Sequence, residues 1–88
     1  MNKYTVAFKP SAKRELEALS SQVQLKILEA LEILSLNPFS DLLQVKKLKG
    51  VESLYRIRIG DYRVVYEVKK KVLLIIVIKI GHRKEVYR

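Results

Sequence analysis

Three arginines stand within eight positions of the segment SLYRIRIGDYRVVY, residues 53–66, which is otherwise rich in strand-forming residues. A guanidinium group is planar, permanently charged and able to donate paired hydrogen bonds to a phosphate. Like charges that face each other on a sheet cost about 0.2–1 kcal/mol per pair, so stability alone would disfavour this cluster. The pattern favours an anion site, although Glu67 and solvent could instead neutralise the group, which consists of Arg56, Arg58 and Arg63.

The geometry of the cluster depends on a hairpin. The Gly-Asp pair at 60–61 fits a two-residue turn between strands at 54–59 and 62–69. In this register Arg58 lies opposite Arg63, and all three arginines share one face. The other face would be covered by helices and would carry the apolar and aromatic side chains, namely Tyr55, Ile57, Ile59, Tyr62, Val64 and Tyr66.

The last segment, IGHRKEVYR at 80–88, carries further groups suited to proton transfer. Histidine titrates near neutral pH, which makes His82 a candidate acid or base. A tyrosine among arginines is favoured in its ionised form, which makes Tyr87 a candidate base. Gly81 would let the segment fold over the arginines and add Arg83 to them. The alternatives are a solvated histidine and a tyrosine packed on the sheet edge.

The net charge of +9 lies entirely in the second half of the chain. Residues 1–43 carry five basic and five acidic side chains, whereas residues 44–88 carry thirteen basic and four acidic ones. This asymmetry indicates a polyanionic partner, with nucleic acid first and an acidic protein or membrane surface second. The alternative is a basic protein whose charge serves solubility.

Several classes of protein are disfavoured by composition. The sequence has no cysteine and one histidine, so we expect no disulfide, no thiolate zinc site and no bound metal. The amino-terminal residues lack the apolar core of a signal peptide. The longest apolar run, at 72–78, has seven residues against the roughly 20 needed to cross a bilayer. We therefore expect a cytoplasmic protein with no membrane contact.

The order of elements predicts a single α+β domain over residues 1–88. Residues 4–8 form a short strand that Pro10 ends, and Ser11 would cap a helix of about two turns. A second helix follows Ser20 and stops at Asn37. Its apolar stripe is Val23, Ile27, Ala30, Leu31 and Leu34.

The remaining strands complete one sheet. A lysine run at 69–71 forms a turn, and the strand at 72–80 is apolar on both sides except at Lys79, which places it inside the sheet. The fold class is thus an amino-terminal strand, a helical hairpin and a three-stranded antiparallel meander, with the helices packed on one face of one sheet.

The segments LYRIRIGDYRVVY and IGHRKEVY, separated by a lysine turn and an apolar strand, resemble the RelE toxins of type II toxin–antitoxin systems, in the RelE/ParE superfamily. The resemblance covers the whole chain, including the Lys-Leu-Lys-Gly segment at 47–50. It implies a RelE-like fold and a metal-independent, cofactor-free endoribonuclease. Such an enzyme enters the ribosomal A site and cleaves mRNA through attack of a ribose 2′-hydroxyl on the adjacent phosphodiester.

The resemblance also assigns catalytic roles. Arg56 and Arg58 match a basic pair that is Lys-x-Lys in some members, and Arg63 matches the arginine of the family's Tyr-Arg-x-x-Tyr strand. Arg83 and Tyr87 match the last arginine and the carboxy-terminal tyrosine. Tyr87 is the first choice for the base and His82 the second, and Arg83 or His82 would protonate the leaving group. Because arginine hardly ever transfers a proton, the pair at 56 and 58 departs from the family's lysines in that respect.

The partners implied are a RelB-like antitoxin, the ribosome with its rRNA, and mRNA, with operator DNA bound only through the antitoxin complex. Two alternatives stay open: a ParE-like inhibitor of DNA gyrase and a non-catalytic RNA-binding module. Electrostatic docking on rRNA would use the remaining basic surface, which comprises Lys46, Lys47, Lys49, Lys69, Lys70, Lys71, Lys84 and Arg88.

Overall fold

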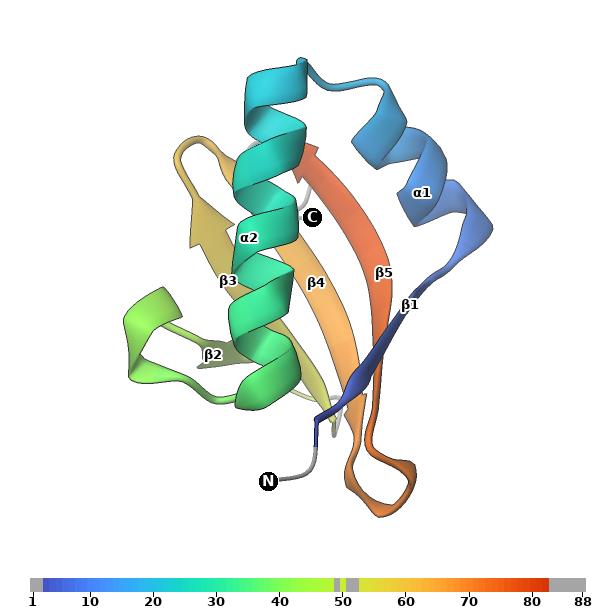
Figure 1. Cartoon of the computed structure of the whole chain (residues 1–88), viewed down its shortest axis with the longest axis vertical. Coiled ribbons are helices and arrows are strands. Elements are labelled where there is room, and N and C mark those ends of the chain that lie inside the picture. The colour runs from blue at the N-terminus through green and yellow to red at the C-terminus, as the bar shows by residue number, and fades with distance from the viewer. Residues whose placement is uncertain (1–2, 49, 51–52, 83–88) are drawn as a thin grey trace.

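Two helices cover one face of a five-stranded sheet in the computed structural model, which describes residues 3–48, 50 and 53–82 (Figure 1). The strand order is β1-β5-β4-β3-β2, with β1 parallel to β5 and every other pair antiparallel. The predicted class and the interior position of the last strand, between β1 and β4, are confirmed. The elements are β1 (Thr5–Phe8), α1 (Pro10–Glu17), α2 (Ser21–Leu36), β2 (Lys46–Lys47), β3 (Leu54–Ile59), β4 (Tyr62–Lys69) and β5 (Leu74–His82), with short 3-10 turns at Asp41–Leu43 and Lys70–Val72.

Two local predictions need correction, and one strand was missed. The first helix begins at Pro10 and not after Ser11, because the fixed φ of proline suits the first helical position, and Lys9 is the extended residue before it. The last strand runs from Leu74 to His82 and not from residue 72 to residue 80, because the lysine turn continues through Val72 and Gly81 stays in the sheet opposite Arg63. The strand β2 was not predicted at all.

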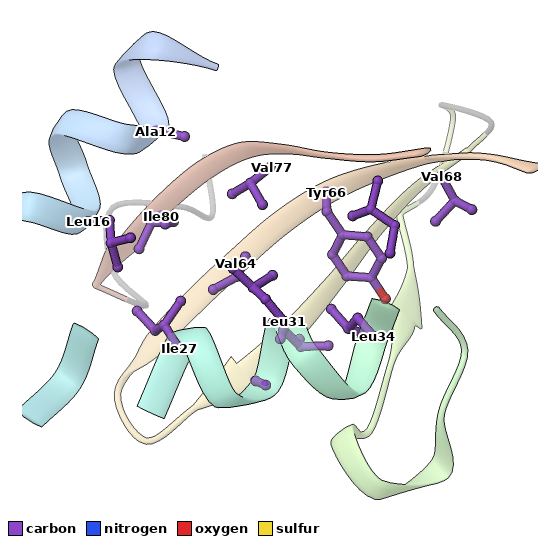
Figure 2. Packing of buried hydrophobic residues seen from close by; sticks show 13 residues of the cluster. Ala12, Leu16, Ile27, Leu31, Leu34, Val64, Tyr66, Val68, Val77 and Ile80 are labelled. Atoms are coloured by element: carbon purple, nitrogen blue, oxygen red, sulfur yellow. The ribbon is translucent and has the colours of Figure 1, made fainter. Parts of the chain in front are cut away.

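The second helix follows its prediction closely. Ser20 is the N-cap, and its hydroxyl accepts a hydrogen bond from the Val23 N–H at 3.3 Å. The helix ends at Leu36, before Asn37. The predicted stripe faces the sheet, where Ile27, Leu31 and Leu34 are almost completely buried against β3, β4 and β5 (Figure 2).

The predicted hairpin register is confirmed residue by residue, with Ile59 opposite Tyr62, Ile57 opposite Val64, and Tyr55 opposite Tyr66. The helix-facing side chains Ile57, Val64 and Tyr66 are fully buried. Gly60 has a φ of +59°, a conformation that suits glycine at the first position of a two-residue hairpin turn. The turn therefore decides which side chains enter the core.

An irregularity in β5 adjusts its register. The pairing of β4 with β5 shifts between Val65 and Tyr66, so that Val65 lies opposite Lys79 while Tyr66 lies opposite Val77. One extra residue in β5 lets both Val77 and Ile80 face the helices, although they are three positions apart. The sequence of β5 could not have predicted this shift, because a run of consecutive apolar residues shows no alternation of polar and apolar side chains.

Tyr66 anchors the loop after α2 to the sheet. Its hydroxyl donates a buried hydrogen bond of 2.8 Å to the carbonyl oxygen of Pro38. Its ring stacks on Tyr55 at a centroid distance of 6.0 Å. Burial, and then the neighbouring Tyr55, raise the pKa of Tyr66 above its ordinary value of 10, so this phenol stays a hydrogen-bond donor.

Glu15 of α1 completes the edge of β5 where β1 ends. Pairing with β1 stops at Val77, and beyond it the N–H of Ile80 donates to Glu15 Oε1 at 2.9 Å. Lys79 Nζ lies 2.7 Å from Glu15 Oε2. Burial raises the pKa of Glu15, but the hydrogen bonds from Ile80 and Lys79 outweigh burial and lower it below 4.5.

Replacing Tyr66 by phenylalanine removes the only hydroxyl that reaches Pro38 among the described residues. We expect Tyr66→Phe to lower the free energy of unfolding by about 1–3 kcal/mol, because a buried carbonyl loses its partner. Denaturation in urea measures this loss. Tyr62→Phe is the control, since the Tyr62 hydroxyl makes no hydrogen bond within the described part of the chain, and equal losses in both variants would contradict the anchoring role.

The variant Glu15→Gln tests the edge contact through its pH dependence. The folded pKa is lowered, so the contribution of the charge is complete above the ordinary value of 4.5 and is lost as the pH falls through the folded value. At neutral pH we expect a loss of about 0.5–1 kcal/mol, because the pair is partly exposed. Urea unfolding measured across the acidic range should show this gap closing. Glu17→Gln on the same helix is the control, and a gap independent of pH would refute the assignment.

Candidate anion site on the arginine face

The three hairpin arginines lie on the side of the sheet turned away from the helices, which we call the arginine face and define by Arg56, Arg58 and Arg63. Arg58 lies directly opposite Arg63, and Arg56 lies opposite Val65. Because paired residues point to the same side of a sheet, the three side chains form one contiguous cluster. The structure thus brings these predicted site residues together.

The arginines differ in accessibility. Arg58 is exposed, whereas Arg56 and Arg63 are each only 5% exposed. A buried cation acts on an anion through a less polar medium than water, which strengthens the attraction. The cluster therefore combines an exposed point of entry with two buried guanidinium groups fixed on neighbouring strands.

Two carboxylates near this face have lysine partners. Glu67 lies diagonal to Arg56, and Lys69 Nζ approaches its Oε2 at 3.7 Å. Glu15 is held by Lys79. Each of these two carboxylates is therefore shared with a lysine.

The unpredicted strand β2 adds a fourth cation. Lys46 lies directly opposite Arg56, so its side chain starts on the arginine face, while Lys47 lies opposite Tyr55 on the other side. A strand of two residues has no periodicity that a sequence could reveal. The available signal was the charge of Lys46 and Lys47, which predicted a contact with rRNA but not the place of either side chain in the sheet.

His82 lies away from the arginines. It pairs with Tyr62, and the residue opposite Arg63 is Gly81. The rings of Tyr62 and His82 meet edge to face at a centroid distance of 5.7 Å. The alternation of side chains therefore places His82 on the helix side of the sheet, and the structure does not group it with Arg56, Arg58 and Arg63.

Four of the docking lysines gather elsewhere. Lys47, Lys69, Lys70 and Lys71 line an open groove of about 550 Å³ together with Tyr55, at the end of β3 and β4 remote from the hairpin turn. Lys70 Nζ also lies 5.1 Å from the centroid of the Phe39 ring, a cation–π distance. Outside the described residues lie the other predicted site residues, Lys49, Arg83, Lys84, Tyr87 and Arg88.

Neither metal ligation nor membrane crossing has a visible basis in the described part of the chain. Residues 3–48, 50 and 53–82 contain no group of three or more His, Asp or Glu side chains placed to hold a metal ion. Within the same ranges no helix is long and apolar enough to span a bilayer.

Known proteins similar to this chain are toxins of type II toxin–antitoxin systems. A family model described as the ParE toxin of type II toxin–antitoxin systems matches residues 6–87. A protein named as the toxin RelE1 of Methanocaldococcus jannaschii is 33% identical over 87 residues, which cover 98% of this chain and 97% of that protein.

Solved structures show the same arrangement. A chain of the archaeal RelE–RelB complex from Pyrococcus horikoshii OT3 superposes with a TM-score of 0.82 at 34% identity, covering 94% of this chain and 97% of that one. The isolated E. coli RelE toxin superposes with a TM-score of 0.78 at 27% identity, covering 90% and 83%. This chain therefore belongs to the RelE/ParE superfamily and is a RelE-like toxin of a type II toxin–antitoxin pair.

Proposed function

We propose that this toxin is a ribosome-dependent endoribonuclease that cleaves mRNA in the ribosomal A site without a metal ion. The observation that carries the proposal is the cluster of Arg56, Arg58 and Arg63 on one face, with two of the three guanidinium groups buried. A scissile phosphodiester gains negative charge as it is attacked, and fixed donors aimed at that charge lower the barrier.

The reaction joins the ribose 2′-oxygen to phosphorus and breaks the bond from phosphorus to the 5′-oxygen. A base accepts the proton of the 2′-hydroxyl, and an acid supplies a proton to the departing 5′-oxygen. Tyr87 is our proposed base. His82 becomes the weaker choice, because its pairing with Tyr62 turns it away from Arg63. Arg83 would join the phosphate-binding cluster.

Docking and inhibition follow from the rest of the surface. The lysines Lys47, Lys69, Lys70 and Lys71 would bind rRNA phosphates. A RelB-like antitoxin would neutralise the toxin, as the complexes of similar chains suggest, and would link it to operator DNA. The groove between β1 and α2, of about 490 Å³ and partly lined by Phe8 and Leu28, offers such a partner apolar surface. Action on ribosomes implies a cytoplasmic location.

Inhibition of DNA gyrase is the second candidate, because the matching family model is described as a ParE toxin. A basic face could also serve an RNA-binding module without catalysis. Translation of a defined message on purified ribosomes separates the three functions. Cuts at the A-site codon support our proposal, whereas an intact message with inhibited gyrase, or with RNA merely retained, would support one of the other two.

Tyr87→Phe and Arg83→Ala test the site assignment in that ribosome assay. Each should retain the fold while cleavage falls by about 10²–10³, the usual cost of losing one preorganised group. Lys26→Ala is the control, since Lys26 is an exposed residue of α2, in the layer on the opposite side of the sheet. Cleavage at the wild-type rate by both variants would overturn the roles of Tyr87 and Arg83.

Arg58→Gln tests whether the arginine cluster trades stability for binding. Removing the charge opposite Arg63 should raise the free energy of unfolding by about 0.2–1 kcal/mol at low salt. The gain should shrink at high salt, where surface charges are screened. The same variant should bind RNA more weakly and with a shallower salt dependence. Urea unfolding measures the stability and fluorescence anisotropy measures the binding of RNA, with Lys13→Gln on α1 as the control. A destabilised Arg58→Gln variant would show that the charge of Arg58 does not lower the stability of the fold.

A further inference from the structure

The proposed reaction needs a proton donor that the hairpin does not supply. A guanidinium group keeps its protons at any physiological pH, so Arg56, Arg58 and Arg63 can bind the phosphate but cannot protonate the departing 5′-oxygen. His82, the titratable alternative, lies beside Tyr62 on the other side of the sheet. Arg83, the other acid that the family resemblance implies, also carries a guanidinium group, so a donor with a readily transferable proton is needed from another group near the arginine face.

The register of β2 places a suitable group there. Lys46 lies directly opposite Arg56 and diagonal to Arg58, which is two residues further along β3. Diagonal neighbours on a sheet are roughly 7–8 Å apart at their Cα atoms, and long side chains can meet across this distance. The ammonium group of Lys46 can thus reach a phosphate held by the arginines.

Two other lysines on this face form ion pairs with described residues, whereas Lys46 forms none with them. Lys79 is 2.7 Å from Glu15, and Lys69 is 3.7 Å from Glu67. Among residues 3–48, 50 and 53–82, no carboxylate forms an ion pair with Lys46, which is exposed like Arg58. An approaching phosphate would therefore meet Lys46 and Arg58 first, above the buried Arg56.

We propose that Lys46 is a catalytic residue of this toxin and acts as the general acid of the cleavage step. The inference rests on the proposed function and deepens it. As the 2′-oxygen bonds to phosphorus and the bond to the 5′-oxygen breaks, one proton moves from the Lys46 ammonium to the 5′-oxygen. The products are a 2′,3′-cyclic phosphate and a 5′-hydroxyl, and the neutral amine regains its proton from solvent.

The test compares Lys46→Arg with Lys46→Gln in single-turnover cleavage of a synthetic message on purified ribosomes. Lys46→Arg keeps the positive charge but loses a transferable proton, so ribosome binding should stay within about threefold while cleavage falls by about 10²–10⁴. Lys46→Gln should lose cleavage to the same extent and also bind more weakly. The matched controls Lys26→Arg and Lys26→Gln, on the helix layer, should cleave like the wild type. Urea unfolding checks that every variant folds.

A substrate with an altered leaving group separates proton donation from phosphate binding. In a message whose scissile 5′-oxygen is replaced by sulfur, the thiolate leaves without protonation. Lys46→Arg should then cleave within about tenfold of the wild type, because the step that needs the acid has been removed.

Two results would overturn the proposal. If Lys46→Arg cleaves the normal message at the wild-type rate, Lys46 only binds phosphate. If the sulfur substrate fails to restore cleavage by Lys46→Arg, the lost function is not proton donation. Absence of cleavage by the wild type itself would instead overturn the proposed endoribonuclease function, and this inference with it, so the two failures are distinguishable.

Discussion

The register of the hairpin between β3 and β4 is the constraint on which the rest of this molecule depends. The two-residue turn at Gly60 and Asp61 pairs Ile57 with Val64 and Arg58 with Arg63. A slip of one residue would move arginines into the core and isoleucine into water. The turn requires a positive φ at Gly60, which glycine adopts at little steric cost because it has no Cβ. One short turn thereby places the apolar side chains of β3 and β4 on the helix side of the sheet and their arginines on the other side.

The apolar side of the hairpin stabilises the strands that carry the arginines on their other side. On the helix side, Tyr66, Ile57 and Val64 bury apolar surface in the core cluster, which stabilises the hairpin. That gain offsets the repulsion between arginines on the other side, which the fold tolerates because each such pair costs only about 0.2–1 kcal/mol. A cluster of like charges survives where a packed core underneath fixes its position. The arginine face is thus held in position by contacts on the opposite side of the sheet.

Elements at the edges of the sheet determine which further side chains lie beside the arginine face. The two-residue strand β2 brings Lys46 beside Arg56, and Glu15 closes the edge of β5 through the N–H of Ile80. β5 also carries the chain into the segment that holds Arg83 and Tyr87. The extra residue near Val77 keeps the core side of β5 apolar despite the register shift. Short pairings of this kind depend on neighbours distant in the sequence, so no local sequence pattern predicts them.

The sequence by itself determined the class of fold, the hairpin register and the family. Strong periodicity and a glycine turn encode these locally, and the arginines at 56, 58 and 63 therefore fell on one face as predicted. Only the tertiary structure decided that Lys46 joins Arg56 and that His82 turns toward Tyr62, away from the arginines. The physical reason is that side-chain direction in a sheet follows from the pairing of strands. Where the pairing partner is remote or the strand has two residues, sequence spacing cannot specify which face a side chain takes.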